Sequence, residues 1–166
     1  MSSRTTKAEI RREKALDEAT DVVLLASRAL VGVAARSLAA TEDQITLVQY
    51  RALVALGAQG DQNVGSLADA LGIHPSTATR LCDRLIVKGF IDRNTSVESR
   101  REVKLALSDS GRALVRAETA RRRRAIRRIV ARLDVETQLE IVEAFGALAD
   151  AAEEVTDQAW KLGWTA

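Results

Sequence analysis

Apolar and polar positions repeat along this chain with two different periods, and each period predicts a type of element. From about Thr6 to Leu38, apolar residues recur at steps of three and four, which is typical of a long amphipathic helix. The same spacing returns in five later segments of the chain. It predicts further helices over about 46–58, 64–71, 75–88, 109–132 and 135–159.

Between the helices predicted over 75–88 and 109–132, the period of the apolar residues changes to two. Phe90 and Ile91 lead into polar residues 92–94, and the apolar residues of 103–107 then alternate with Lys104 and Ala106. Alternation of this kind predicts two strands, and the charged stretch TSVESRRE between them predicts a hairpin with a long polar tip.

Capping residues mark several of the expected ends. His74 stands where the helix from Pro75 would have its N-cap, and proline is favoured at the first helical position. Gly89 is placed to end that helix, and Ser108 is placed to cap the next one. Because serine is the more usual cap, the side chain of His74 has the alternative of facing a DNA backbone.

The stretch SLADALGIHPSTATRLCDRL has the spacing of a helix-turn-helix. Ala68 and Ala78 are small residues on either side of Gly72, as two helices that cross steeply at short range require. The hairpin that follows makes the unit a winged helix. Its small core is expected from Leu67, Leu71, Ile73, Leu81 and Leu85.

The second helix of this unit has two distinct faces. Ala78, Leu81, Cys82, Leu85 and Ile86 form one apolar stripe. Hydroxyls and guanidiniums on the other side suit a helix that enters the DNA major groove, although a solvated surface would show the same polarity. The predicted base and phosphate contacts are Ser76, Thr77, Thr79, Arg80 and Arg84, with His74 as a further contact at the helix start.

Charge is unevenly distributed, although the net charge is only +2. Residues 74–132 contain 16 Lys and Arg against 6 Asp and Glu, whereas residues 134–159 contain eight acids and no basic residue. A concentrated basic region indicates a surface that binds polyanions. The alternative is that basic and acidic helices pair within a dimer, and both explanations are open for the run RRRRAIRR at 121–128.

These motifs together resemble the MarR family of transcriptional regulators. The resemblance lies in STATRLCDRLIVKGFIDR, in SVESRREVKLALSDSGRAL and in the long flanking helices, so it covers essentially the whole chain. It implies a dimer that binds palindromic DNA, often as a repressor relieved by a small, frequently anionic aromatic, ligand. Arg36 and Tyr50 are candidates for contacts to such a ligand, whose site the sequence leaves unassigned.

The resemblance also assigns roles in the tip of the wing. Arg101 stands at the position of the family's wing arginine, which enters the minor groove, and Arg100 beside it is expected at a phosphate. Ser99 is a departure, because the family usually has an acidic residue there. Ser99 cannot form the ion pair that would brace the wing.

The expected fold is mainly α with a small β-hairpin wing: a winged helix-turn-helix flanked by long N- and C-terminal dimerisation helices. We expect an N-terminal dimerisation helix over 1–40, a DNA-binding lobe over 41–107 and C-terminal dimerisation helices over 108–166. The lobe is too small to bury the stripes of the long helices. A second copy of the chain is the simplest partner for them.

Composition supports a cytoplasmic protein without a catalytic centre. Hydrophobic residues make up 46% of the chain and aromatic residues 3%. The N-terminus lacks a signal-peptide pattern, and Arg28 and Arg36 interrupt the most apolar stretch, which argues against a membrane span. One histidine and one cysteine assemble neither a metal site nor a catalytic set, so we expect no cofactor, no metal and no enzyme activity. Cys82 is expected in the core rather than as a redox sensor.

The sequence therefore predicts a dimeric, sequence-specific regulator of double-stranded DNA. Its operator would be pseudo-palindromic, and a small-molecule ligand would release it. The alternative is a winged helix used only for protein interaction or dimerisation, which would need no basic recognition face.

Overall fold

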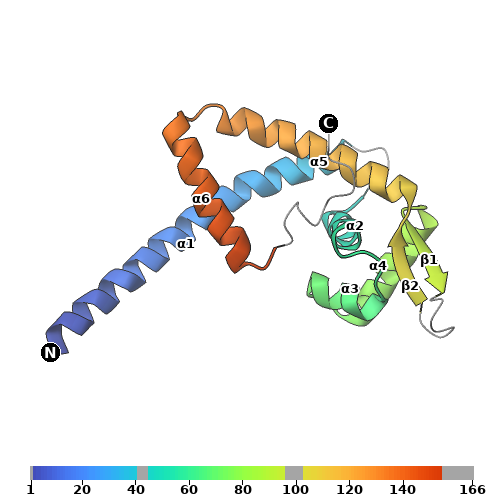
Figure 1. Cartoon of the computed structure of the whole chain (residues 1–166), viewed down its shortest axis with the longest axis horizontal. Coiled ribbons are helices and arrows are strands. Elements are labelled where there is room, and N and C mark those ends of the chain that lie inside the picture. The colour runs from blue at the N-terminus through green and yellow to red at the C-terminus, as the bar shows by residue number, and fades with distance from the viewer. Residues whose placement is uncertain (1, 41–44, 96–102, 155–166) are drawn as a thin grey trace.

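The computed structural model describes residues 2–40, 45–95 and 103–154, and these form a helical protein with one two-stranded sheet (Figure 1). The predicted order of elements and the predicted fold class are confirmed. The elements are α1 (Ser2–Ala39), α2 (Leu47–Gln59), α3 (Val64–Leu71), α4 (Pro75–Val87), β1 (Ile91–Thr95), β2 (Val103–Leu107), α5 (Asp109–Val130) and α6 (Val135–Ala151).

The core lies in a lobe built from α2, α3, α4, the hairpin and the start of α5. Leu53, Leu67, Leu85 and Leu105 are completely buried there. Ala68 of α3 and Ala78 of α4 are also completely buried, which confirms the predicted close contact of the two helices. Gly72 adopts a left-handed conformation (φ 63°) at the end of α3, so the turn between them requires a residue that tolerates positive φ.

The hairpin is extended by a short contact that the hydrophobic pattern gives no sign of. β1 and β2 pair antiparallel, with Ile91 opposite Leu107. Gln62, in the loop before α3, forms an isolated bridge with Leu105 through two backbone hydrogen bonds of 3.2 and 2.8 Å. The bridge joins the base of the wing to the start of the helix-turn-helix.

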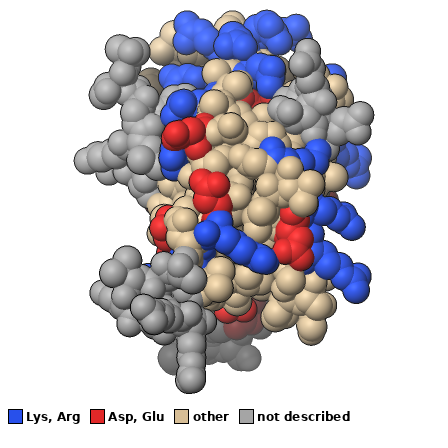
Figure 2. Space-filling model, turned by 90° about the vertical axis from the view of Figure 1, so that its right-hand side faces the viewer, with Lys and Arg blue, Asp and Glu red and all other residues tan. Residues whose placement is uncertain are grey.

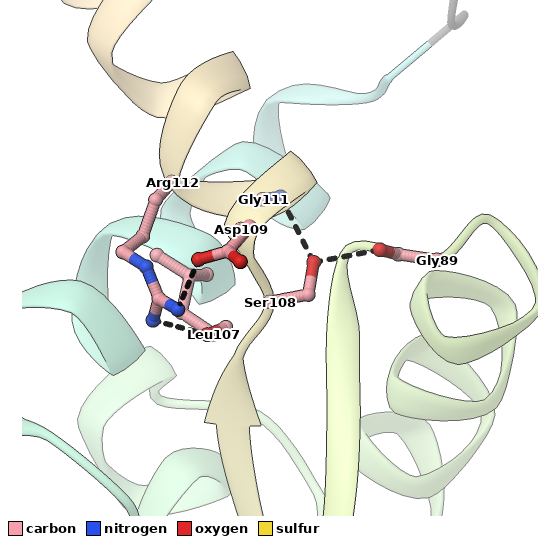
Figure 3. A network of polar contacts seen from close by, with 6 residues as sticks. All are labelled: Gly89, Leu107, Ser108, Asp109, Gly111 and Arg112. Carbon is pink, nitrogen blue, oxygen red and sulfur yellow. Dashed lines mark hydrogen bonds and ion pairs between the residues drawn. The ribbon is translucent and has the colours of Figure 1, made fainter.

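The junction between the hairpin and α5 is held by Ser108 (Figure 3). Its hydroxyl donates to the carbonyl of Gly89 (2.6 Å) and accepts from the backbone N–H of Gly111 (3.0 Å), so one side chain caps α5 and also fixes the turn after α4. Arg112 donates to the Leu107 carbonyl and to the Asp109 carboxylate. The predicted serine cap is therefore confirmed.

The long helices lie mostly outside the lobe (Figure 1). Of the α1 side chains that the structure describes, those that are buried lie at the C-terminal end, at Val33, Ala34, Ser37 and Leu38, and α6 has no buried residue. Large apolar side chains exposed on these two helices include Val22, Leu24, Leu25, Val31, Val135, Leu139, Val142 and Phe145.

The residues that the structure describes include one helix, Lys7–Ala39, long and apolar enough to cross a membrane by length and composition alone. Its most apolar window has a mean hydropathy of 1.7, and only 17% of that window is buried. Arg28 and Arg36 interrupt this stretch, but the helix still meets the length and hydropathy criteria for a membrane span.

The last helix ends earlier than predicted, so its expected end near residue 159 is wrong. α6 stops at Ala151, and Glu153 adopts a left-handed backbone conformation (φ 51°). Acidic side chains at 150, 153 and 154 lie where the helix dipole places partial negative charge, and no basic residue occupies the last turn. The periodic pattern of apolar residues does not report this electrostatic cost.

Substitution of Gly111 by alanine should destabilise the lobe. A Cβ atom at this position would lie 2.2 Å from the carbonyl oxygen of Phe90, so α5 or the turn after α4 would have to move. We expect a loss of about 1–3 kcal/mol in the free energy of unfolding, measured by urea denaturation. Ser110→Ala, at an exposed neighbouring position, is the matched control. An unfolding midpoint equal to that of the control would contradict the close approach.

Candidate nucleic-acid interface

The helix α4 begins at a histidine cap. The Nδ1 atom of His74 accepts a hydrogen bond from the backbone N–H of Ser76 (3.3 Å) and lies 2.9 Å from the Ser76 hydroxyl, and Pro75 is the first helical residue. The predicted N-cap and the predicted proline position are confirmed. Because Nδ1 acts as the acceptor, the proton of the neutral ring is on Nε2, which is left as a donor.

The outer face of α4 carries the predicted polar set. Its members are all exposed, whereas Ala78, Leu81, Cys82 and Leu85 are buried on the other side. The Thr79 hydroxyl donates to the Pro75 carbonyl (3.0 Å), so it presents only lone pairs to a ligand. The structure therefore brings five predicted contacts onto one surface: Ser76, Thr77, Thr79, Arg80 and Arg84.

An ion pair braces this surface, and sequence reasoning missed it. Asp83 of α4 accepts from Arg93 of β1 at 2.7 Å, and both side chains are about half exposed. The pair fixes the outer face of α4 relative to the first strand of the wing. It also neutralises the acidic residue that lies between Arg80 and Arg84 in the sequence. Alternation in β1 places Arg93 outside the core, but only the fold shows which acid it meets.

Cys82 belongs to the core, as expected. Its side chain is completely buried beside Leu81 and Leu85. Burial raises the pKa of its thiol, with a smaller contribution in the same direction from the charge of Asp83. The thiolate that oxidation requires is therefore disfavoured.

A buried polar junction joins the lobe to the long helices. Glu118 of α5 is completely buried; it accepts from the Ser37 hydroxyl of α1 (2.5 Å) and pairs with Arg121. Nearby on α5, the Thr119 hydroxyl lies 2.9 Å from that of Tyr50, whose ring is faced by Arg122 at 5.6 Å. Arg121 and Arg122 are thus engaged inside the protein and do not belong to an exposed basic patch.

Comparison with known proteins identifies the family. The family model described as MarR matches residues 45–103. The HTH-type transcriptional repressor MdtR of Bacillus subtilis is 30% identical over 119 residues, which span 72% of this chain and 77% of that protein. The crystal structure of RV1404 from Mycobacterium tuberculosis is 40% identical, with a TM-score of 0.78 over 84% of this chain and 95% of that one. The chain belongs to the MarR family.

Membership of the MarR family makes this a DNA-binding transcriptional regulator of a non-enzymatic class. A MarR family protein from Bacillus stearothermophilus has the same fold, with 21% identity and a TM-score of 0.77 over 86% of this chain and 98% of that one. The resemblance in α4 (the predicted recognition helix), in the hairpin and in the flanking helices is therefore confirmed at the level of family and fold.

The tip of the MarR wing falls outside the described residues. Arg100 and Arg101, the two predicted wing contacts, lie there together with Ser99. The structure describes the strands on either side, with Lys104 half-buried on β2. Figure 2 shows the face of the lobe, where basic side chains are interspersed with acidic ones.

Replacement of His74 should separate its capping role from other contacts. His74→Ala removes the acceptor for the Ser76 N–H, and we expect the free energy of unfolding to fall by about 0.5–1 kcal/mol. His74→Asn supplies a favoured capping side chain and should restore or exceed the original stability. Urea denaturation of the three proteins gives the comparison. Equal stability of the Ala and Asn variants would show that the cap contributes nothing.

Proposed function

We propose that the protein is a dimeric regulator that binds a pseudo-palindromic operator, acts as a repressor and is released by a small ligand. The observation that carries the proposal is the exposed polar and basic face of α4, which Asp83 and Arg93 hold against the wing. Arg80 and Arg84 are proposed to contact base edges or phosphates, with Arg101 in the minor groove and Arg100 at a phosphate. The Nε2–H of His74 is proposed as a further phosphate donor.

A second copy of the chain is the proposed cover for α1 and α6. Among the described residues, the large apolar side chains of α1 are exposed over most of its length, and α6 has no buried residue. In a two-fold dimer these surfaces cover each other, and the two α4 helices would then meet successive major grooves. Half-sites should lie about one helical turn apart, roughly 10 bp from centre to centre.

The same apolar surface is the reason that α1 meets the criteria for a membrane span. We assign it to the dimer because its C-terminal end is buried at Val33, Ala34 and Leu38, and Leu38 belongs to the core of the lobe. A helix embedded in lipid could not place this end against the lobe and keep Arg28 and Arg36 hydrated. Chromosomal DNA is in the cytoplasm of a bacterial cell, where such a regulator would act.

Release by a ligand is supported by relatives. MepR of Staphylococcus aureus has been solved bound to ethidium bromide, and BpsR of Bordetella bronchiseptica is described as regulated in its DNA binding by 6-hydroxynicotinic acid. In this chain the junction around Tyr50 and Glu118 joins the lobe to α1 and α5. A ligand bound there would change how the lobe is set on the long helices. Linkage requires such a ligand to bind the free protein more tightly than the DNA complex.

Arg80→Ala should weaken operator binding by about 1–3 kcal/mol and relax the base preference at one position of each half-site. Selection of bound sequences from a random library, followed by titration at fixed salt, measures both effects. Lys88→Gln is the control, since it removes one exposed positive charge just beyond α4. A uniform loss over all sequences would reassign Arg80 to phosphate. No loss at all would favour the alternative of a winged helix used only for protein interaction.

Charged residues on α6 should separate the proposed dimer. The double variant Leu139→Asp, Val142→Asp places two carboxylates in the apolar face, and we expect the dimer dissociation constant to rise at least about a hundredfold. Sedimentation equilibrium measures it, and Glu140→Gln, Glu143→Gln is the matched control on the same helix. A monomeric parent protein, or recovery of the parent only in detergent, would contradict this assignment.

A further inference from the structure

The run of arginines on α5 is divided by the fold into internal and external members. Arg112, Arg121 and Arg122 have partners within the chain: Asp109, Glu118 and the ring of Tyr50. Five others are exposed on α5 and have no ion pair with any described residue. Arg123 lies beside the apolar Val130 on the helix, and we call the remaining four the outer arginine face: Arg116, Arg124, Arg127 and Arg128.

The outer arginine face points away from every surface that α5 uses for packing. At about 100° per residue, Arg116 lies opposite the buried Glu118, so this side faces away from the lobe. The apolar residues near the C-terminal end of α5 (Ile126, Ile129 and Val130) have a mean direction roughly 160° from that of Arg124, Arg127 and Arg128.

This division decides between two anionic partners for the arginines. The acidic helix α6 of a second copy would be the partner if the arginines lay beside the apolar face that the proposed dimer covers. They lie on the other side of α5, so the dimer that buries Ile129 and Leu133 leaves them in solvent. An external polyanion is then the partner that the charges favour.

Within residues 2–40, 45–95 and 103–154, no acidic side chain forms an ion pair with this face. The residues between its arginines on that side are alanines, at 117 and 120, and Glu118 is buried against Ser37. Arg124 and Arg128 are four residues apart, a spacing at which like charges destabilise an isolated helix. Binding of an anion removes that repulsion. Figure 2 shows Lys and Arg along the upper edge of the molecule, the side on which α5 runs in Figure 1.

We propose that the outer arginine face of α5 binds the phosphate backbone of a second segment of duplex DNA, separate from the operator held by α4. The proposal rests on the function proposed above, which places DNA on the opposite part of the chain. From Arg116 to Arg128 the helix rises about 18 Å, along which one DNA strand carries about five phosphates. Guanidinium groups bind phosphate through two parallel hydrogen bonds. A dimer with two such faces bridges separate stretches of DNA without reading their sequence.

The test uses operator duplexes fixed to beads, loaded with the full-length protein and incubated with a fluorescent duplex of unrelated sequence. The triple variant Arg124→Gln, Arg127→Gln, Arg128→Gln should keep the operator footprint and lose capture of the second duplex. The slope of log affinity for that duplex against log salt should fall by about three per protomer. Arg11→Gln, Arg12→Gln, Lys14→Gln removes the same charge from exposed positions of α1 and should leave capture unchanged.

Three results would overturn the proposal: no capture by the parent protein, equal capture by the triple variant and the parent, or dissociation of the triple variant into monomers. The last would assign the arginines to the acidic residues of the partner copy. Protein fixed directly to beads separates this proposal from the operator proposal. When the protein itself is fixed to the beads, the double variant Arg80→Ala, Arg84→Ala should still capture the unrelated duplex through α5. The capture must depend on Arg124, Arg127 and Arg128 even if no operator is found.

Discussion

The close approach of α5 to the turn after α4 is the constraint on which the rest of the structure depends. Gly111 lies so near the Phe90 carbonyl that no side chain fits, and Ser108 binds Gly89 and caps α5 with one hydroxyl. The end of the recognition helix, the base of the wing and the start of the long helix therefore meet within a few residues. A movement of α5 would therefore displace the end of α4.

Two further polar contacts join this region to its neighbours, one to the wing and one to α1. Asp83 and Arg93 fix α4 to β1 on the outer side of the lobe. Glu118 and Ser37 fix α5 to α1 on the inner side, and Glu118 is costly to bury unless both Ser37 and Arg121 stay in place. The ligand proposed above, bound at this junction, would change how the lobe is set on α1 and α5.

The division of labour along α5 explains why a single helix is so rich in arginine. Its first half serves the lobe, with Leu114 and Val115 buried and Arg112 fixing the junction. Its second half carries apolar residues on one side and unpaired arginines on the other. The arginines of α5 therefore have two different roles: some pair within the protein and others form an external surface. Their direction around the helix decides which role each one has.

The sequence by itself determined the order and nearly all the bounds of the elements, because helical and strand periods and caps such as His74 and Ser108 act over a few residues. It also determined which face of α4 is polar and, through its motifs, the family. Only the tertiary structure decided which distant groups meet: Asp83 with Arg93, Glu118 with Ser37, and Gln62 with Leu105. It also decided where α6 ends and which arginines of the run stay unpaired. The physical reason is that spacing along a chain fixes the direction of a side chain on its own element, whereas its partner depends on how the elements pack.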